Sequence, residues 1–378
     1  MSAGAQEIFI RHPDFYVPAF TVKQDNKALG PDVVRDVIQV TYRDTLQEFD
    51  SFEITINNEW DLGKRSFKYS DARLFDPGSR IDLWMGYLGK DSMQLMLTGE
   101  VTSLRPAFPE SGTSSLTVGG LNLLHRFRTK QESHSYLNKT DTQIAKTVTG
   151  RLRARLAAAP LPPGGEVQHK LIVQDNQYDI LFLLERARRI GYDLFVQEVG
   201  SSGRAEESVL YFGPSGGIIR PAYKLGYGRS LIQFAPTLTT ANQVDKVVVR
   251  AWDSRNAKPI VKEYTRKQLG LNRRAGDAGG RDTVDKSFEQ REEIIVDHPV
   301  TSAEEAERLA RSRLEENAKD FIKGSGSTVG IPSLRAGSVL DLDGLGERFS
   351  GRYFVTGTTH TINDSGYRTQ FECRREEK

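Results

Sequence analysis

The sequence has almost no cysteine, because Cys373 is the only one among 378 residues. A single thiol excludes an intrachain disulfide framework and the zinc or thioredoxin motifs that need paired cysteines. Long apolar runs are missing too. The most apolar stretch, Ile180–Leu184, has five residues, whereas a helix that spans a bilayer needs about 20. The sequence therefore predicts a core held by packing alone and no stable membrane insertion.

The sequence also lacks a large excess of charge of either sign. Lysine and arginine number 52 against 50 aspartates and glutamates, which leaves a formal net charge of +2. A dedicated nucleic-acid binder needs a basic field that neutralises phosphates, so this balance predicts no nucleic-acid specificity. The first nine residues lack the basic and apolar segments of a secretory signal. We therefore expect the protein to be made and kept in a cytoplasm.

The length suggests two or three domains, and the residue pattern changes twice along the chain. Short alternating apolar and polar runs predict a first β domain over residues 1–128. Helical periodicity with a few strand-like runs predicts a small α/β insertion over residues 129–230. Strand patterns return over residues 231–378, which predicts a second β domain. The sequence thus predicts a β-rich α+β protein.

Three helices are predicted inside this framework. The first helix has apolar residues at every fourth position: Ile144, Val148, Leu152 and Leu156. The second is predicted over Tyr178–Ile190, with Gly191 as its C-terminal stop. Ser302 and Glu305 form a capping box that predicts a third helix near residues 302–320.

The most informative feature is an internal duplication. The segment Gly78–Leu83 is echoed by Gly337–Leu342 with four identities and one Ile/Leu exchange over six positions. The shared positions are predicted to form structural repeat turns: Gly78, Ser79, Asp82, Gly337, Ser338 and Asp341. A Thr-Gly pair and a Ser-Gly turn follow in both copies: Thr98-Gly99 with Thr356-Gly357, and Ser111-Gly112 with Ser365-Gly366. A duplicated β unit explains this order, and the alternative is two unrelated meanders that share turn residues.

The sequence contains partial matches to catalytic and ligand-binding motifs, but the residues around each match do not fit the structure that the motif needs. Gly213–Gly217 matches the GxSxG pattern, but Ile218–Pro221 follows where a nucleophile elbow needs a helix. The six histidines lie far apart and form no HExxH motif. Asp341–Gly344 begins like a calcium loop, but Arg352 occupies the twelfth position, which must be acidic. We predict no catalytic, cofactor-binding or metal-binding residues, no cofactor and no enzyme, although a glycosidase carboxylate pair without a local pattern stays open.

Two further features are interpreted as structural. Gly324–Gly326 resembles a phosphate loop but lacks the GxxxxGK motif, so we interpret it as flexible backbone. Two basic clusters lie on predicted helices, and we interpret them as solvated helix faces. They contain Arg151, Arg153 and Arg155, and Arg186, Arg188 and Arg189.

Several longer segments resemble one known family, in the same order along nearly the whole chain. They are Leu74–Gly78, Thr98–Val101, Gly119–Asn122, Gln174–Leu183, Gly330–Ser338, Phe349–Val355, His360 and Gly366–Thr369. The family is phage late control gene D, which includes tail hub proteins of contractile phages and pyocins and the N-terminal part of the VgrG spikes of type VI secretion.

The resemblance implies a homotrimer in which each chain supplies two tube-like β-barrel domains related by pseudo-duplication, with the α/β domain inserted. Three such chains present pseudo-sixfold symmetry, which suits a baseplate hub that joins a trimeric spike to a hexameric inner tube. The implied partners are the spike protein, the inner tube protein and other baseplate components. The implied location is the cytoplasm of the producing bacterium during assembly, and then the baseplate of a phage tail or injection-system particle.

VgrG proteins continue into an OB-fold and a long β-helix, and no such repeats follow here before Lys378. We therefore expect the spike to be a separate polypeptide. Phage tails and phage-derived injection systems fit equally well. A tail-associated peptidoglycan hydrolase and a receptor-binding tail protein remain alternative functions.

Overall fold

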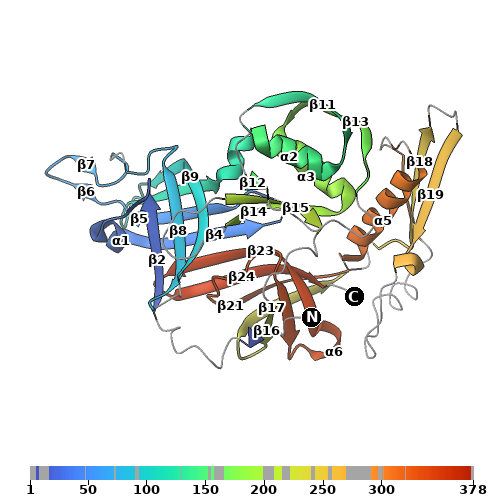
Figure 1. The fold of residues 1–378 in the computed structure, drawn as a ribbon. Helices are drawn as coiled ribbons and strands as arrows, with labels where there is room; N and C mark the ends of the chain where they lie inside the picture. Colours follow the sequence, from blue (N-terminus) through green and yellow to red (C-terminus); the bar gives the residue numbers. More distant parts are fainter. Residues whose placement is uncertain are drawn as a thin grey trace.

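The computed structural model describes residues 6–7, 17–46, 48–71, 74–89, 93–128, 130–151, 155–156, 166–198, 208–214, 222–239, 243–253, 258–269, 291–296, 300, 302–319 and 321–375. Its largest element is a 14-stranded sheet that contains two β units of similar topology (Figure 1). The smaller sheets belong to two excursions from these units. None of the helices in the described ranges is long and apolar enough to cross a membrane.

The first β unit has the strand order β4-β5-β10-β9-β8-β2. Its strands are β2 (Pro18–Gln24), β4 (Val37–Thr45), β5 (Ser51–Asn57), β8 (Arg80–Tyr87), β9 (Gln94–Ala107) and β10 (Ser115–Asn122). Shorter elements complete it: β3 (Lys27–Ala28), α1 (Pro31–Asp36), β6 (Trp60–Asp61) and β7 (Ser66–Phe67). Alternate residues such as Phe52, Ile54 and Ile56 point into one core, as the period-two pattern predicts.

The second β unit has the strand order β17-β21-β24-β23-β22-β16. Its strands are β16 (Ala222–Gly226), β17 (Leu231–Leu238), β21 (Ile322–Val329), β22 (Val339–Asp343), β23 (Gly351–Asn363) and β24 (Gly366–Arg375), with α6 (Gly346–Phe349) between β22 and β23. In chain order these strands correspond one by one to β2, β4, β5, β8, β9 and β10. One difference is that β2 is antiparallel to β8, whereas β16 is parallel to β22. The predicted β-rich α+β class with two duplicated β units is confirmed.

The two units are joined edge to edge. Strand β23 of the second unit pairs antiparallel with β4 of the first, from Gly357 opposite Thr45 to Asn363 opposite Gln39. In Figure 1 the red and blue strands lie side by side along this joint. Strands β17-β21-β24-β23-β4-β5-β10-β9 therefore form one continuous run of eight.

The α/β excursion between β10 and β16 packs helices on small sheets. It contains η1 (Leu123–Arg128), β11 (Gln131–Lys139), α2 (Asp141–Arg151), β12 (Arg155–Leu156), β13 (His169–Tyr178), α3 (Asp179–Ile190), β14 (Tyr192–Glu198) and β15 (Ser208–Pro214). Helix α3 agrees with its prediction, and Gly191 ends it in the left-handed conformation at φ 71°. Helix α2 is shorter than predicted: it ends at Arg151, Leu152 lies outside the described residues, and Leu156 belongs to β12, which pairs with β15. Tertiary pairing overrides the helical period there.

A second excursion lies between β17 and β21 in the sequence. It contains β18 (Lys246–Asp253), β19 (Lys258–Thr265), η2 (Arg266–Leu269), β20 (Glu292–Ile295) and α5 (Ala303–Lys319). The Glu305 N–H donates to Ser302 Oγ at 3.1 Å, which confirms that the capping residue begins α5. Strand β16 precedes residue 231, where the second β domain is expected to begin, and it pairs with β22 of the second unit. Its register is set by a strand more than 110 residues away, which no local pattern reveals.

Candidate functional site

The two predicted repeat turns have the same backbone geometry. Gly78 and Gly337 adopt φ values of 90° and 87°, a region that favours glycine. The Gly78 N–H donates to the Val101 carbonyl and the Gly337 N–H to the Val355 carbonyl, each at 2.8 Å. Each glycine thus pins the start of one strand to the middle of the next strand in its own unit.

The residues after each glycine agree in part. The Ser79 and Ser338 carbonyls accept from the N–H of Val101 and of Val355, at 3.0 and 2.9 Å. The acidic residues differ. Asp82 is buried and accepts from Thr98 Oγ1 at 2.9 Å, whereas Asp341 lies opposite Arg352 and is partly exposed. The turns are therefore equivalent as backbone, and their carboxylates are not.

One predicted correspondence in the repeat is wrong. Asp82 lies opposite Thr98 and Asp341 lies opposite Arg352, so Thr98 corresponds to Arg352. The counterpart of Thr356 is Thr102, because each is skipped in the pairing of its strand, as a β-bulge residue is. Sequence spacing could not reveal where the extra residue sits. The Ser-Gly turns do correspond, since Gly112 and Gly366 have φ values of 101° and 108°.

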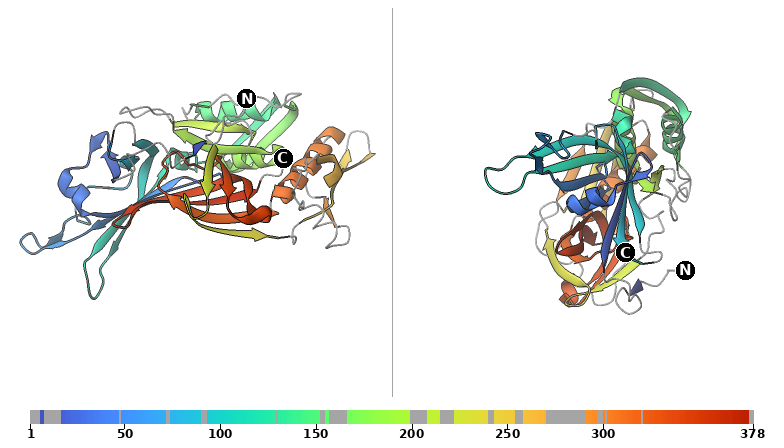
Figure 2. Two further views of the ribbon diagram at one scale, coloured as in Figure 1. Left: turned by 90° about the horizontal axis from the view of Figure 1, so that it is seen from below. Right: turned by 90° about the vertical axis from the view of Figure 1, so that its left-hand side faces the viewer.

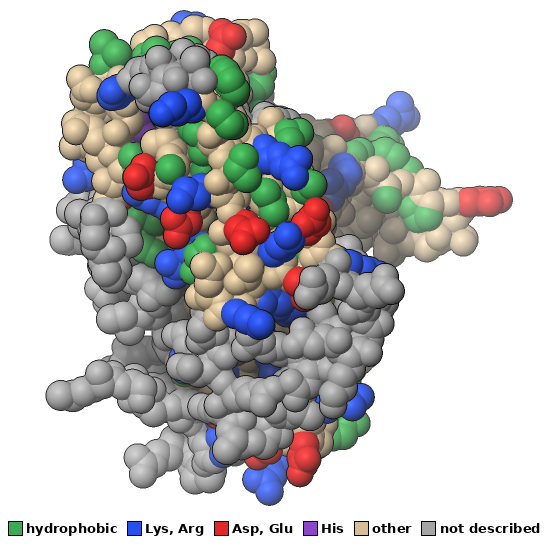
Figure 3. Space-filling view, turned by 90° about the vertical axis from the view of Figure 1, so that its right-hand side faces the viewer, with side chains coloured by type: hydrophobic (Ala, Val, Ile, Leu, Met, Phe, Trp, Pro, Cys, Tyr) green, Lys and Arg blue, Asp and Glu red, His purple; other side chains and the backbone are tan. Residues whose placement is uncertain are grey.

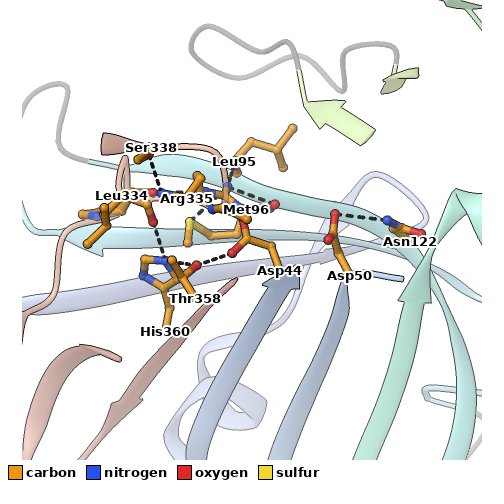
Figure 4. A network of polar contacts seen from close by, with 12 residues as sticks. Asp44, Asp50, Leu95, Met96, Asn122, Leu334, Arg335, Ser338, Thr358 and His360 are labelled. Atoms are coloured by element: carbon orange, nitrogen blue, oxygen red, sulfur yellow. Dashed lines mark hydrogen bonds and ion pairs between the residues drawn. The ribbon is translucent and has the colours of Figure 1, made fainter. Parts of the chain in front are cut away.

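A buried polar network lies where the two units meet, and we call it the seam (Figure 4). Arg335, in the connection between β21 and β22, reaches across to the first unit and donates through Nη2 to the carbonyls of Leu95 and Met96, both at 3.0 Å. Its Nε donates to the Pro332 carbonyl at 3.2 Å. Its guanidinium carbon lies 4.5 Å from the centre of the Tyr42 ring, which favours a cation there.

Asp44 is the acidic member of the seam. One carboxylate oxygen accepts from the Ala336 N–H at 3.0 Å, and the other accepts from the Thr358 hydroxyl. Its Oδ2 lies 4.0 Å from Arg335 Nη1. The charge of the largely buried Arg335 is thus balanced by a carboxylate that is itself hydrogen-bonded, as charges removed from water require.

His360 completes the seam and is fully buried. Its Nε2 lies 2.9 Å from the Leu334 carbonyl, which can only accept, so Nε2 carries the proton. Its Nδ1 then accepts from the Tyr367 hydroxyl at 2.9 Å. Burial, with help from the nearby Arg335 charge, lowers the pKa of His360 to about 3. The imidazole is therefore a neutral structural group.

The seam also anchors the α/β excursion. Phe195 of β14 and Tyr211 of β15 pack in one buried cluster with Leu46, Ala336 and Phe354. These last three residues come from the ends of strands and the connection that build the joint. The seam is therefore the point where all three parts of the fold meet.

The eight-strand run has one apolar and one polar side. Residues such as Ile54, Phe371 and His360 point into the two cores. The opposite side, which we call the polar face, carries hydroxyl, amide and charged groups: Arg43, Glu53, Thr55, Arg105, Thr117, Thr359, Gln370, Glu372, Ser325 and Gln233. A groove of about 950 Å³ lies over part of this face, between the sheet and residues of α3 and α5.

Gly324–Gly326 lies in β21 between β17 and β24 and is not flexible backbone. A Cβ on Gly324 would lie 2.6 Å from the Phe234 ring, and one on Gly326 would lie 2.5 Å from the Phe371 ring. The glycines therefore make room for aromatic core residues, a reason that a local motif search cannot detect.

The interpretation of the basic clusters as solvated faces is wrong for Arg186, whereas Arg151 is exposed although it is also paired. Arg186 is buried, and its Nε donates to Asp141 at 2.6 Å, beside His169 at 2.9 Å from the same carboxylate. Burial acts to raise the pKa of the Asp141 carboxyl, but hydrogen bonds from His169 and Arg186 outweigh it and hold the pKa below its usual value. Arg151 donates to Asp179 at 2.7 Å. These pairs hold α2, β13 and α3 together.

The remaining residues of the basic clusters and of the two partial motifs lie at different places in the fold. Arg188 is exposed and Arg189 half-buried. Arg153 and Ser215–Gly217 of the GxSxG pattern lie outside the described residues, and Arg155 belongs to β12. β22 ends at Asp343, and Gly344 turns the chain at φ 80°.

Charges on the α5 side of the molecule are mixed in sign. Figure 3 shows basic and acidic side chains interspersed over the described part of that face. On α5 itself, Arg311 pairs with Glu315 at 2.8 Å and Arg313 with Glu316 at 2.9 Å. Within the part of the chain that the structure describes, no three His, Cys, Asp or Glu side chains are grouped to hold a metal ion.

Comparisons with known proteins agree with this fold. The 43 kDa tail protein of prophage MuSo2 from Shewanella oneidensis has a TM-score of 0.69 and 15% identity, covering 95% of this chain and 98% of that one. A tail protein from Neisseria meningitidis has a TM-score of 0.68 and 13% identity, covering 96% and 97%. An E. coli protein described as a component of the type VI secretion system has a TM-score of 0.57 and 13% identity, covering 94% and 77%. The chain thus shares the fold of these proteins.

No curated protein matches the sequence significantly. A family model described as the Alg8 N-terminal domain matches residues 17–364. This match runs from the start of the first β unit to the last hairpin of the second. The chain therefore belongs to the Alg8 N-terminal domain family.

Proposed function

We propose that three copies of this chain form the hub of a contractile tail or injection-system baseplate, of the late control gene D type, and join a trimeric spike to a hexameric inner tube. The observation that carries the proposal is the continuous run of eight strands, four from each of two equivalent units. A threefold assembly of chains that each contain two equivalent units presents six similar units around its axis. Such a ring fits a threefold partner at one end and a sixfold partner at the other.

The described edges of the run suit a closed ring. One end is β17, and the other is the second half of β9, since β8 pairs only with residues 94–100 of that strand. Two different edges of one chain make a head-to-tail contact, which forms a closed ring when the rotation fits. Closure also pairs strand edges that would otherwise template aggregation.

The two sides of the sheet give the ring an inside and an outside. The apolar side is covered by the cores of both units, so it cannot line an open channel. The polar face, with residues such as Thr55, Thr117 and Gln370, is suited to water. We therefore place the polar face toward the channel. The seam then serves to hold the two units of one chain at the angle that the ring requires.

The similarity to tail proteins supports a structural role rather than an enzymatic one. The partners in this proposal are two further copies, the spike, the inner tube protein and other baseplate components. Assembly takes place in the cytoplasm of the producing bacterium, and the ring then belongs to the particle. The three predicted domains remain part of the proposal, with β16 counted in the second β domain.

The mass in solution tests the proposal. Light scattering of the purified chain, alone and co-produced with the spike polypeptide of the same particle, should give about 127 kDa for three chains of 42.4 kDa (3 × 42.4). Negative-stain images should show rings with six similar lobes. A chain that stays monomeric with its spike present overturns the proposal. Clearing of cell walls, or saturable binding to whole target cells, would instead support the hydrolase or the receptor-binding alternative.

A further inference from the structure

The pairing of β23 with β4 inside one chain is a guide to how two copies of the chain would pair with each other. There, Thr361 lies opposite Thr41 and Ile362 opposite Val40. Ile362 and Tyr367 belong to the second unit in sequence, yet both pack in the core cluster of the first. The end of one unit thus completes the core of the next.

The internal repeat shows which residues would form the same joint between β17 and the second half of β9, the two edges of the eight-strand run among the described strands. Thr102 in β9 and Thr356 in β23 are the skipped residues of their strands, which sets an offset of 254. Ile38 in β4 and Ile232 in β17 are likewise skipped, which sets an offset of 194. These isoleucines are also alike in exposure, at 42% and 49%.

Applying both offsets places β9 of one copy against β17 of the next in a defined register. Each pair repeats one pair of the internal joint. Four of the seven resulting pairs join residues of one type: Leu104 with Leu238, Pro106 with Pro236, Ala107 with Ala235, and Phe108 with Phe234. The other three pairs are Ser103 with Thr239, Arg105 with Thr237, and Pro109 with Gln233.

Two prolines, Pro106 and Pro236, remove backbone hydrogen bonds from the middle of the predicted joint. The Thr239 N–H donates toward β21. Because N–H groups alternate along a strand, position 236 faces the outer edge of β17. Pro236 has no N–H, and Pro106 would lie opposite it without one either. The middle of the joint therefore lacks its N–H donors, which blunts each edge in isolation.

Aromatic side chains are placed to supply the missing contact. Phe108 is 57% exposed, its ring lies 4.7 Å from that of Phe67, and Phe67 lies 4.8 Å from Trp60. Figure 2 shows the β6–β7 and β9–β10 hairpins, which carry these rings, projecting from the same end of the first unit. On the other edge, Phe234 is only partly buried and packs 5.4 Å from the Tyr353 ring of its own core.

We propose that this chain binds a second copy of itself through β9 and β17 in the stated register, with the aromatic cluster Trp60, Phe67 and Phe108 packed on Phe234 of the next copy. The cluster would complete the second unit's core as Ile362 completes the first unit's. The inference rests on the proposed ring and adds its contact.

Engineered disulfides test the register. A chain with Ala107→Cys and Ala235→Cys should form covalent trimers on mild oxidation, because both positions are exposed and directly opposite in the predicted joint. Thr41→Cys with Thr361→Cys, a pair inside the chain, is the positive control and should link without increasing the mass. Ala107→Cys with Gln233→Cys is the shifted control and should link poorly. Cys373 is buried and stays in every variant.

The outcomes separate the inference from the proposed function. Covalent trimers from the 107 and 235 pair support both. Rings of trimer mass that link only through the shifted pair, or through neither, overturn the register and leave the hub proposal standing. Monomers with the spike present overturn both.

The aromatic contact has its own test. Phe108→Ser should weaken self-association by about tenfold or more, since buried aromatic anchors dominate interface energies. Trp252→Ser is a matched control, because Trp252 is 60% exposed on β18, outside the predicted joint. Equal loss in both variants, or no loss from Phe108→Ser, contradicts the proposed contact.

Discussion

Acidification should destabilise the seam through His360. The pKa of this imidazole is about 3 in the folded chain because it is fully buried, against about 6.5 for an unfolded histidine. The unfolded chain therefore binds the proton more tightly. The stability that the neutral imidazole contributes is complete above about pH 6.5 and falls by about 1.4 kcal/mol per pH unit as the pH decreases toward 3. Between about pH 6.5 and pH 5 the free energy of unfolding should drop by about 2 kcal/mol.

Urea unfolding followed by intrinsic fluorescence at several pH values measures this slope. His360→Gln removes the titrating group and should flatten the curve over that interval, even if the variant is less stable at every pH. His134→Gln changes a partly exposed histidine on β11, far from the seam in sequence, and is the control variant. A wild-type curve without a slope, or one that His360→Gln leaves unchanged, would refute the reasoning.

Other perturbations separate buried from exposed positions. Arg335→Met removes the hydrogen bonds to three carbonyls and leaves the Asp44 carboxylate without its nearby cation, so it should lower the free energy of unfolding by about 3–5 kcal/mol. Arg43→Met on the exposed face should cost less than about 0.5 kcal/mol by urea titration. Gly120→Ala places a Cβ 2.2 Å from a core phenylalanine ring and should cost about 1–3 kcal/mol, whereas Gly150→Ala in α2 meets open space and should add about 0.5–1 kcal/mol, both from thermal melts. Arg186→Met removes the arginine partner of the buried Asp141 carboxylate, which keeps only His169 among the described side chains. A loss of stability below about 1 kcal/mol in the same melts would contradict the structural role of Arg186.

Local chemistry in the sequence accounts for much of the secondary structure. Period-two alternation identified the buried side of strands such as β5, because successive side chains point to opposite faces. Ser302 and Gly191 marked helix ends through capping rules that act within one turn. The repeated glycines at 78 and 337 located two equivalent turns, since only glycine adopts their φ without strain.

Long-range pairing was decided by the tertiary structure alone. Alternation shows which side of β23 is buried, but not that β4, more than 300 residues earlier, lies beside it. The bulges at Thr102 and Thr356 explain why the two repeats were matched wrongly by their spacing in the sequence. An extra residue in a strand changes the register of the residues after it, and the sequence pattern does not show where that residue lies. Arg186 and Arg335 look like surface charges in the sequence, and only the carboxylates and carbonyls that the fold brings to them make their burial possible.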